Sequence, residues 1–383
     1  MSVETIKVLH INCNYMGTKL HQIMIEHLNS YVTENKVFCP IYRGSELVTV
    51  PNDNVVVANC FTLADRAFFY RKQRKIISSL ESKIDVSKYN IIHAYTLFTD
   101  GNAAFELSRK YNIPYVVAVR ATDLQFFRYR PYLKKHGLDI LRNASRIIFL
   151  ADTTRNFVLE HYVATNERTF IYNKSSIIPN GIDDFWLDNC YKERKVKEIQ
   201  NKLDNKTVGI ICVAQIIKRK NIPLLQKAIA ILNQKGWNIH LTVIGKAVNK
   251  RELAKIKKDS NTSYLSPVAK EKLIEYYRNA DIFALTSQGE TFGLVYAEAM
   301  SQGLPVIYSK EEGFDGQFSD GEVGYAVNIK DVMEIAEKIE NICCNYSKIV
   351  KNTAKNVSKF RWDDICIQYH DIYNMSKSMS NRG

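Results

Sequence analysis

The stretch that most constrains the fold is 281–309, where two apolar segments flank a loop and a helix. DIFALT (281–286) and LPVIYS (304–309) are short and bounded by turn residues, so each predicts a buried strand. The intervening SQGETFGLVYAEAMSQG (287–303) predicts a loop that opens a helix. In strand, loop, helix and strand units, ligands bind beyond the carboxyl ends of the strands, where helix N-termini offer free amides to phosphate. The sequence therefore predicts an α/β protein whose residues 291–294 present amides to a phosphate.

Two glutamates of this segment, Glu290 and Glu298, lie eight residues apart. Because eight residues rotate about 80° beyond whole turns of a helix, the two acids converge only if Glu290 lies in the loop. A carboxylate beside a diphosphate would be repelled, so sugar hydroxyls are the natural partners of these acids. The alternative is an acid that favours the helix dipole and a second, solvated acid, and for two isolated glutamates we would prefer it.

The first half of the chain repeats the alternation of strands and helices. KVLHINC (7–13) predicts an apolar strand, followed by a loop that contains Gly17 and by an amphipathic helix over about 20–28. Further strands are predicted where short apolar runs recur, at 91–94, 115–119 and 146–150. This punctuation is typical of α/β domains. A glycine after a strand usually serves turn geometry alone, so Gly17 is weak evidence by itself.

The pattern around the two glutamates resembles the glycosyltransferases of family 4, in the glycogen-phosphorylase and glycosyltransferase superfamily. The match consists of E-x7-E followed by A-M-x-x-G-x-P-V-I, carried here by Glu290, Glu298, Ala299, Met300, Gly303, Pro305, Val306 and Ile307. The resemblance covers nearly the whole chain. It implies the α/β fold called GT-B, in which two Rossmann-like domains face each other across a central cleft.

The resemblance also implies roles for residues of the donor site. Glu290 would contact hydroxyls of the donor sugar near the reacting carbon, and Glu298 would bind the ribose of the nucleotide. Sugar and diphosphate oxygens would be bound by the backbone amides of Phe292, Gly293 and Leu294.

A second match follows the strand predicted at 208–214, where Lys220 falls at the diphosphate-binding lysine of the family. Relatives usually carry an arginine five residues earlier, but this chain has Gln215, which we keep as a weaker candidate for donor binding. Either Arg219 or Lys218 supplies the missing charge, or both belong to a solvated basic turn.

Three residues of the first half align with family positions near the donor sugar. Gly17 sits where relatives place a glycine next to the donor phosphate and the acceptor. Arg120 and Asp123 stand where many relatives have His-Gly-x-Asp, so Asp123 matches and Arg120 departs. A guanidinium forks well onto a carboxylate, so Arg120 could select a charged donor, such as a uronic acid nucleotide, or an anionic part of the acceptor. The alternative is that Arg120 pairs with Asp123 and shapes the loop.

Domain boundaries follow from composition and from the resemblance. SIIPNGID (176–183) matches the segment that ends the first domain in relatives, and the chain becomes charged after it. We predict an acceptor-binding domain over 1–185, a nucleotide-sugar-binding domain over 186–360, and a helix over 361–383 that crosses back to the first domain.

Composition indicates the compartment and the partners. No C-x-x-C, secretory leader or long apolar run is found, so we expect reduced thiols and a cytoplasmic protein. A net charge of +13 favours an anionic partner, and nucleic-acid motifs are absent. Aromatic and basic residues gather at 66–75 and 126–135, so we predict peripheral attachment to the inner face of the cytoplasmic membrane. The alternative is a solvated basic face over buried aromatics.

The sequence therefore predicts a retaining, metal-independent hexosyltransferase. It would move a sugar from a nucleotide diphosphate sugar, UDP- or GDP-linked, to a glycan or lipid-linked saccharide in cell-surface polysaccharide biosynthesis. No further cofactor or metal site is expected, and Glu290, Lys220 and Arg120 are the candidate catalytic residues. A non-catalytic nucleotide-sugar-binding subunit with this fold and a nucleotide-sugar epimerase remain as alternatives.

Overall fold

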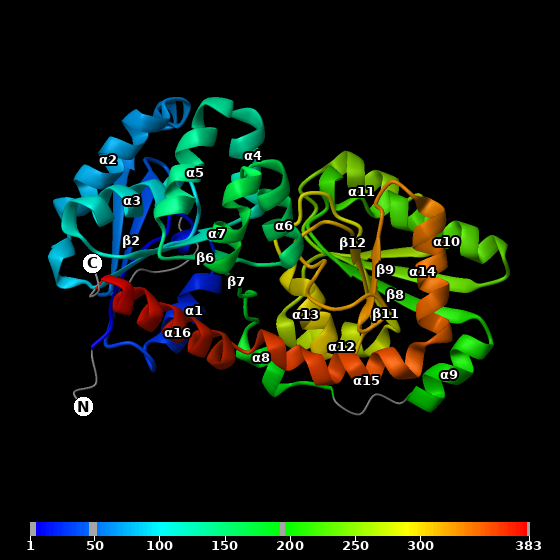
Figure 1. The fold of residues 1–383 in the computed structure, drawn as a ribbon. Helices are drawn as coiled ribbons and strands as arrows, with labels where there is room; N and C mark the ends of the chain where they lie inside the picture. The colour runs from blue at the N-terminus through cyan, green and yellow to red at the C-terminus, as the bar shows by residue number, and fades with distance from the viewer. Residues whose placement is uncertain (1–4, 46–51, 192–195, 381–383) are drawn as a thin grey trace. The chain divides into compact units, whose positions relative to one another are not determined.

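The computed structural model describes residues 5–45, 52–191 and 196–380 (Figure 1). The chain divides into two compact units, which we call the first and the second domain. The first comprises Met1–Gly181 together with Trp362–Gly383, and the second comprises Ile182–Arg361. The sequence places these divisions at 185/186 and 360/361. Helix α16 (Trp362–Ser380) therefore belongs to the first domain.

The first domain is built on a parallel sheet whose seven described strands run in the order β3-β2-β1-β4-β5-β6-β7. The strands are β1 (Lys7–Ile11), β2 (Glu34–Tyr42), β3 (Val55–Phe61), β4 (Ile91–Ala94), β5 (Tyr115–Val119), β6 (Arg146–Phe149) and β7 (Ser175–Ile177). The predicted strands at 91–94 and 115–119 are confirmed as β4 and β5, and those at 7–13 and 146–150 as the slightly shorter β1 and β6.

Helices cover both faces of this sheet. They are α1 (Leu20–Leu28), α2 (Phe69–Glu81), α3 (Thr99–Tyr111), α4 (Ala121–Tyr129), α5 (Lys134–Asn143), α6 (Asp152–His161), α7 (Arg168–Asn173) and α16. Figure 1 shows α2, α3 and α5 on one side of the sheet and α1 and α16 on the other. The core follows this division: Val117 packs in the cluster on the α2 and α3 side, whereas its neighbours Val116 and Ala118 pack with α16.

Strand β5 and helix α16 show why the sequence takes these forms. All five residues of β5, YVVAV, are buried, as expected for a parallel strand covered on both faces. In α16, the residues Trp362, Cys366, Tyr369 and Tyr373 are buried in one cluster. Their spacing of three and four residues places them on one face of the helix. The last helix is thus held by an apolar stripe.

The second domain repeats the architecture with a parallel sheet in the order β10-β9-β8-β11-β12-β13. The strands are β8 (Thr207–Val213), β9 (Asn238–Ile244), β10 (Thr262–Leu265), β11 (Ile282–Ala284), β12 (Val306–Ser309) and β13 (Gly324–Val327). The helices are α8 (Asp184–Asp188), α9 (Val196–Asp204), α10 (Ile222–Gln234), α11 (Lys250–Ile256), α12 (Lys270–Asn279), α13 (Leu294–Ser301), α14 (Val332–Cys344) and α15 (Tyr346–Asn356). The predicted unit at 281–309 is confirmed as β11, α13 and β12.

Strand order locates the candidate sites. In the first sheet the chain leaves β1 in one direction to β2 and β3 and in the other to β4, and in the second sheet β8 has the same position between β9 and β11. Such switch points leave a crevice at the carboxyl ends of the strands, where α/β proteins bind ligands. The residues after β1, β4 and β5, and those after β8, β11 and β12, are therefore the ones to inspect.

Candidate active site

Three loops at the carboxyl edge of the second sheet hold one another through the backbone. The Gln288 N–H, after β11, donates to the Arg219 carbonyl, after β8, at 2.7 Å. The Gly313 N–H, after β12, donates to the Glu290 carbonyl at 3.0 Å. The Glu312 carboxylate accepts from the Gly289 N–H at 2.8 Å. The loop that carries Glu290 is thus fixed from both sides before any ligand arrives.

Lys220 and Glu290 form an ion pair in this edge. The Lys220 ammonium donates to Glu290 Oε2, which also accepts from the Ser287 hydroxyl at 3.1 Å. Their side chains are only 11% and 13% exposed. Glu290 lies in the loop, as the spacing of the two glutamates predicts, and Lys220 ends the 3-10 helix Lys218–Lys220. The structure therefore brings together the two predicted residues of opposite charge.

The start of helix α13 provides the predicted backbone amides. Gly293 precedes the helix with φ of 78°, a left-handed conformation that favours glycine. Phe292 is buried, with its ring 6.2 Å from that of Phe314 and 5.8 Å from that of Phe360. Leu294 is the first helical residue. The three candidates thus differ in role: the Phe292 side chain anchors the turn, and Gly293 and Leu294 form the helix N-terminus.

Glu298 lies in the middle of α13 and has a perturbed carboxyl group. Burial raises its pKa to about 7, the Asp183 carboxylate reinforces this rise, and the Lys270 ammonium opposes it. Lys270 itself contacts Asp183 in an ion pair. None of the described residues donates a hydrogen bond to the Glu298 carboxylate, and the residue is half-buried.

The basic turn after β8 contains Gln215 and the two candidates for the missing positive charge, Lys218 and Arg219. Gln215 is exposed, and its carbonyl accepts from the Ile217 N–H at 3.0 Å. Arg219 approaches the Glu290 loop, with its guanidinium 3.5 Å from the Gly289 carbonyl and its own carbonyl bound to Gln288. Of the two candidates for the missing charge, Arg219 is therefore placed at the site. From the sequence, Arg219 could equally belong to a solvated basic turn, because it is adjacent to Lys220, the residue that matches the motif.

Gly17 lies at the corresponding edge of the first domain, in the 3-10 helix Tyr15–Gly17 after β1. It is exposed, and no described atom lies within 4 Å of the position that a Cβ would take. The loop is tethered by the Asp100 carboxylate, which accepts from the Cys13 N–H at 3.1 Å and from the Thr96 hydroxyl at 3.0 Å. Burial raises the Asp100 pKa to about 7. Asp100 was missed from sequence because nothing in a helical TDGN run marks a buried acid.

Asp123 and Arg120 take separate roles after β5. The Asp123 carboxylate accepts from the backbone N–H of Arg120 at 2.8 Å and from that of Phe98 at 3.4 Å, and burial raises its pKa to about 6. The Arg120 guanidinium points elsewhere: its Nε donates to the Tyr95 carbonyl at 3.2 Å. Asp123 thus shapes the loop, as the alternative predicts. The expected pairing of its side chain with the Arg120 guanidinium is wrong, because the carboxylate accepts from backbone N–H groups instead.

Other sequence expectations concern metals and thiols. Within 5–45, 52–191 and 196–380, no three or more His, Cys, Asp or Glu residues gather as a metal site would require. All eight cysteines lie in the described ranges as thiols, with no disulfide between them.

Two family models match the chain, one in each half. The model described as Glycosyltransferase Family 4 matches residues 25–184, and the one described as Glycosyl transferases group 1 matches residues 193–360. The capsular polysaccharide biosynthesis glycosyltransferase CapM of Staphylococcus aureus is 28% identical over 283 residues, which are 71% of this chain and 72% of the relative. The alpha-monoglucosyldiacylglycerol synthase of Acholeplasma laidlawii is 25% identical over 336 residues, 82% of this chain and 80% of the relative.

The fold is shared with a solved structure. Anabaena HepE in complex with UDP-glucose matches with a TM-score of 0.65 and 17% identity, over 98% of this chain and 99% of that chain. The findings together define the class: glycosyltransferases of two Rossmann-like domains, the GT-B fold. The chain belongs to glycosyltransferase family 4. It is an enzyme of the hexosyltransferase type that serves polysaccharide or glycolipid biosynthesis.

Proposed function

We propose that this enzyme transfers a hexose from a nucleotide diphosphate sugar to a saccharide or lipid-linked acceptor, with the anomeric configuration retained and without a metal ion. The observation that carries the proposal is the Lys220–Glu290 pair beside the N-terminus of α13. An ammonium and helix amides suit a diphosphate, and a carboxylate suits sugar hydroxyls. One small site thus offers both kinds of group that a nucleotide sugar needs.

The residues support a charge-stabilised departure of the diphosphate. The bond between C1 of the sugar and the diphosphate oxygen breaks, and a bond from C1 to the acceptor oxygen forms on the same face. The acceptor proton passes to the departing phosphate oxygen. Lys220 and the amides at Gly293 and Leu294 would stabilise the developing negative charge, which is often the largest catalytic contribution. Glu290 would orient the sugar through its hydroxyls.

The donor would be UDP- or GDP-linked, and no further cofactor is required. The Anabaena neighbour of the same fold holds UDP-glucose, which favours a uridine nucleotide. Glu298 would accept hydrogen bonds from the ribose hydroxyls, because its carboxylate has no hydrogen-bond donor among the described residues. Arg219 would supply the second positive charge that Gln215 lacks.

Calorimetry with UDP, GDP, UDP-glucose and GDP-mannose tests the donor site. We expect one nucleotide to bind, and Lys220→Met to weaken that binding at least tenfold, since a buried charge-assisted contact is lost. Lys258→Met is the matched control, because Lys258 is an exposed lysine of the same domain with no role in the site. Equal losses in both variants would place the diphosphate elsewhere.

Retention and metal independence need the turnover reaction. With the donor identified, NMR of the product should show the same anomeric configuration as the donor. Turnover should survive EDTA. An inverted product would overturn the mechanism, and activity lost to EDTA and restored by a divalent cation would overturn metal independence.

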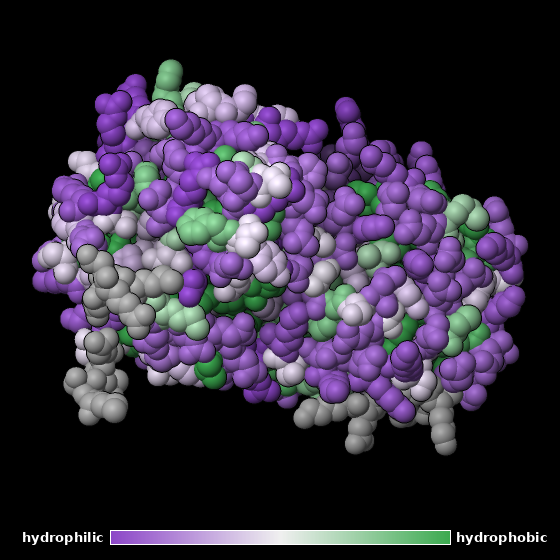
Figure 2. Space-filling model, viewed as in Figure 1, coloured by the Kyte–Doolittle hydropathy of each residue, from purple (hydrophilic) through white to green (hydrophobic). Residues whose placement is uncertain are grey.

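We further propose that the first domain docks on the inner face of the cytoplasmic membrane through an aromatic–basic surface. The exposed side chains of this surface are Leu63, Arg66, Phe68, Tyr70, Arg71, Arg74, Arg128, Tyr129, Tyr132, Lys134 and Lys135. Its two stretches are joined by a hydrogen bond of 3.1 Å from the Arg130 guanidinium to the Arg66 carbonyl, and by the Tyr70 and His136 rings, 5.8 Å apart. Figure 2 shows hydrophobic side chains among hydrophilic ones over the α2 and α5 end of this domain.

Exposed aromatics and cations together suit an anionic lipid surface, to which each basic residue adds about 1 kcal/mol. Phe68 and Tyr129 are 61% and 69% exposed. Across the described ranges, no helix is both long and apolar enough to cross a bilayer. Docking would therefore depend on this surface.

Sedimentation with vesicles tests the docking surface. We expect pelleting with vesicles that contain phosphatidylglycerol and not with pure phosphatidylcholine. The double variant Phe68→Ser and Tyr129→Ser should stay in the supernatant, whereas Met333→Ser, at an exposed apolar residue of the second domain, should pellet. Equal recovery from both kinds of vesicle would leave the surface as a solvated basic face.

A further inference from the structure

The Arg120 guanidinium is a buried cation with few partners. Arg120 is 7% exposed. Its Nε donates to the Tyr95 carbonyl at 3.2 Å, and its Nη1 lies 3.5 Å from Asn180 Oδ1. Its Nη2 is buried and has no hydrogen-bond partner in the described structure. The acceptors around the guanidinium are therefore neutral oxygens, of the Tyr95 carbonyl, the Asn180 amide and the Tyr369 hydroxyl, and Nη2 has no hydrogen-bond partner at bonding distance.

None of the described acids neutralises this charge by an ion pair. Asp123 is the closest acid in sequence, and its carboxylate accepts hydrogen bonds from the backbone N–H groups of Arg120 and Phe98. Asp100 is bound by the Cys13 N–H and the Thr96 hydroxyl, and its raised pKa makes it a weak source of negative charge. The Tyr369 hydroxyl is a further neighbour, and it is neutral because burial raises its pKa to about 12.

The histidines around Arg120 are neutral as well. Burial and the Arg120 charge lower the pKa of His21 to about 3, and burial lowers that of His10 to about 4. The pKa of His93 is lowered by burial and by His10 and Arg120. Among these histidines and Arg120, only Arg120 is charged near neutral pH, and the Asp123 carboxylate, with a pKa of about 6, is a negative charge that interacts with it without forming an ion pair.

Two more polar groups of this edge lack partners. Asn12 follows β1, and its Nδ2 is buried without an acceptor, and His21 of α1 has a buried Nδ1 without a partner. Arg120 itself precedes α4, whose N-terminus adds positive potential. Asn12 and Arg120 follow β1 and β5 at the switch-point edge of the first sheet, where α/β domains bind ligands. The His21 ring lies 4.7 Å from the ring of Tyr95, whose carbonyl accepts from Arg120.

A buried charge without a counter-ion is costly, and native proteins leave few buried donors unpaired. We infer that Arg120, with Asn12 and His21, forms a subsite for an anionic group of the substrate other than the nucleotide diphosphate: a carboxylate or a phosphate monoester. The inference rests on the proposed transferase function. Two sources have this chemistry, a carboxylate on the donor sugar and a phosphate on a lipid-linked acceptor.

Matched pairs of ligands distinguish the two sources. In the first arm, binding of UDP-glucose is compared with UDP-glucuronate, and GDP-mannose with GDP-mannuronate. In the second arm, farnesyl phosphate is compared with farnesol below their aggregation limits. We expect the wild-type enzyme to prefer the charged member of at least one pair by tenfold or more. Preference in the first arm assigns the donor carboxylate, and preference in the second assigns the acceptor phosphate.

Variants show whether Arg120 causes the preference. Arg120→Gln should abolish it while leaving UDP or GDP affinity within twofold. Arg142→Gln is the control, because Arg142 is an arginine of the same domain that two carboxylates already neutralise. If Arg120→Gln does not fold, Arg120→Lys keeps the charge without the fork and should reduce the preference severalfold.

Three results would overturn the subsite. They are equal binding of charged and uncharged members in both arms, an unchanged preference in the Arg120 variant, and a loss of affinity for the bare nucleotide as large as that for its charged conjugate. A failure of every nucleotide to bind would instead count against the proposed function. The farnesyl phosphate arm would then decide the subsite alone.

Discussion

The carboxyl edges of the two sheets have the same position in similar domains, yet they differ in how their buried cations are paired. In the second domain, three loops interlock and the buried Lys220 is paired with Glu290. In the first domain, Arg120 is buried without a carboxylate partner, and Gly17 faces open space. The second edge is thus complete before ligand arrives, whereas the first gains most when a ligand supplies the missing acceptors.

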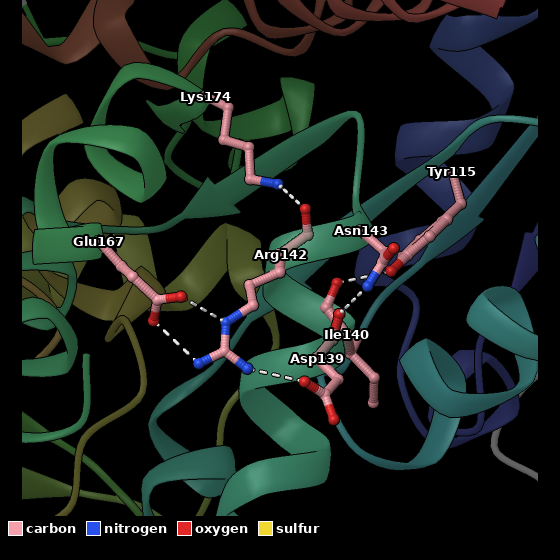
Figure 3. A network of polar contacts seen from close by, with 7 residues as sticks. All are labelled: Tyr115, Asp139, Ile140, Arg142, Asn143, Glu167 and Lys174. Carbon is pink, nitrogen blue, oxygen red and sulfur yellow. Dashed lines mark hydrogen bonds and ion pairs between the residues drawn. The ribbon is translucent and has the colours of Figure 1, made fainter. Parts of the chain in front are cut away.

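A second arginine of the first domain, Arg142, is paired with carboxylates and gives a direct comparison with Arg120. In Figure 3, the Arg142 guanidinium makes two bonds of 2.8 Å to Glu167 and one of 2.7 Å to Asp139. Lys174 caps the same helix by donating to the Arg142 carbonyl at 2.6 Å. The fold therefore pairs a guanidinium fully where its role is structural. Arg120 is left open in the more buried place, which favours a ligand role.

The largest effect should come from the glycines of the two edges. Gly293→Ala forces a side chain into φ of 78°, with its Cβ 2.4 Å from the Tyr296 ring. Left-handed backbone costs about 1 kcal/mol and overpacking a further 1 to 3 kcal/mol, so we expect a loss of about 3 kcal/mol. Gly17→Ala should cost less than about 0.5 kcal/mol, because its site is open. Urea unfolding followed by tryptophan fluorescence measures both, and similar losses would remove the contrast in packing.

The next effect concerns the paired charges of the second edge. Lys220→Met leaves Glu290 buried without its cation, and Glu290→Gln does the reverse, so each should cost about 2 kcal/mol. The double variant should cost much less than the sum, with a coupling energy of at least about 1 kcal/mol. A double-mutant cycle from denaturant unfolding measures this. Additive losses would show that Lys220 and Glu290 do not stabilise each other. The contrast between a paired Lys220 and an unpaired Arg120 would then fail.

Most of the fold, and part of the site, was predictable because these features follow from short sequence patterns. Strands β4 and β5 are apolar runs between turn residues, and the glutamate motif fixed Glu290 in its loop. The state of Arg120 was not predictable, since whether a guanidinium finds a carboxylate depends on β4, β5 and β7 meeting at one edge. Asp100 and Arg219 were missed or underrated for the same reason. Their contacts join segments far apart in the sequence, and no spacing rule encodes them.

Arg142 and Arg120 of the first domain should differ in their effect on stability, and this difference is smaller. Arg142→Gln breaks a bidentate pair that is about one-third exposed, so it should cost about 1 to 2 kcal/mol. Arg120→Gln removes a buried charge that forms no ion pair with a described acid, so it should cost less than about 0.5 kcal/mol or be stabilising. Thermal unfolding without ligand checks both. A loss in Arg120→Gln as large as that in Arg142→Gln would mean that Arg120 is a structural arginine after all.

The smallest effect concerns Glu298, a half-buried acid of the second edge to which no described residue donates a hydrogen bond. Its pKa of about 7 lies above the value of 4.5 for an ordinary glutamate. The folded state therefore binds the proton more tightly, and the associated stability is present at low pH and lost as the pH rises towards 7. Between pH 6 and 8, the wild type should lose about 1 kcal/mol relative to Glu298→Gln.

Unfolding free energies of wild type and Glu298→Gln across that pH range make the measurement, and parallel curves would contradict it. Donor affinity should follow the opposite trend, because the carboxylate that destabilises the free enzyme above pH 7 is the form that accepts hydrogen bonds from ribose hydroxyls. The advantage of the wild type over Glu298→Gln in donor binding should thus grow with pH. Each edge would then carry one charge whose cost in the free enzyme is recovered on binding: Arg120 in the first domain and Glu298 in the second.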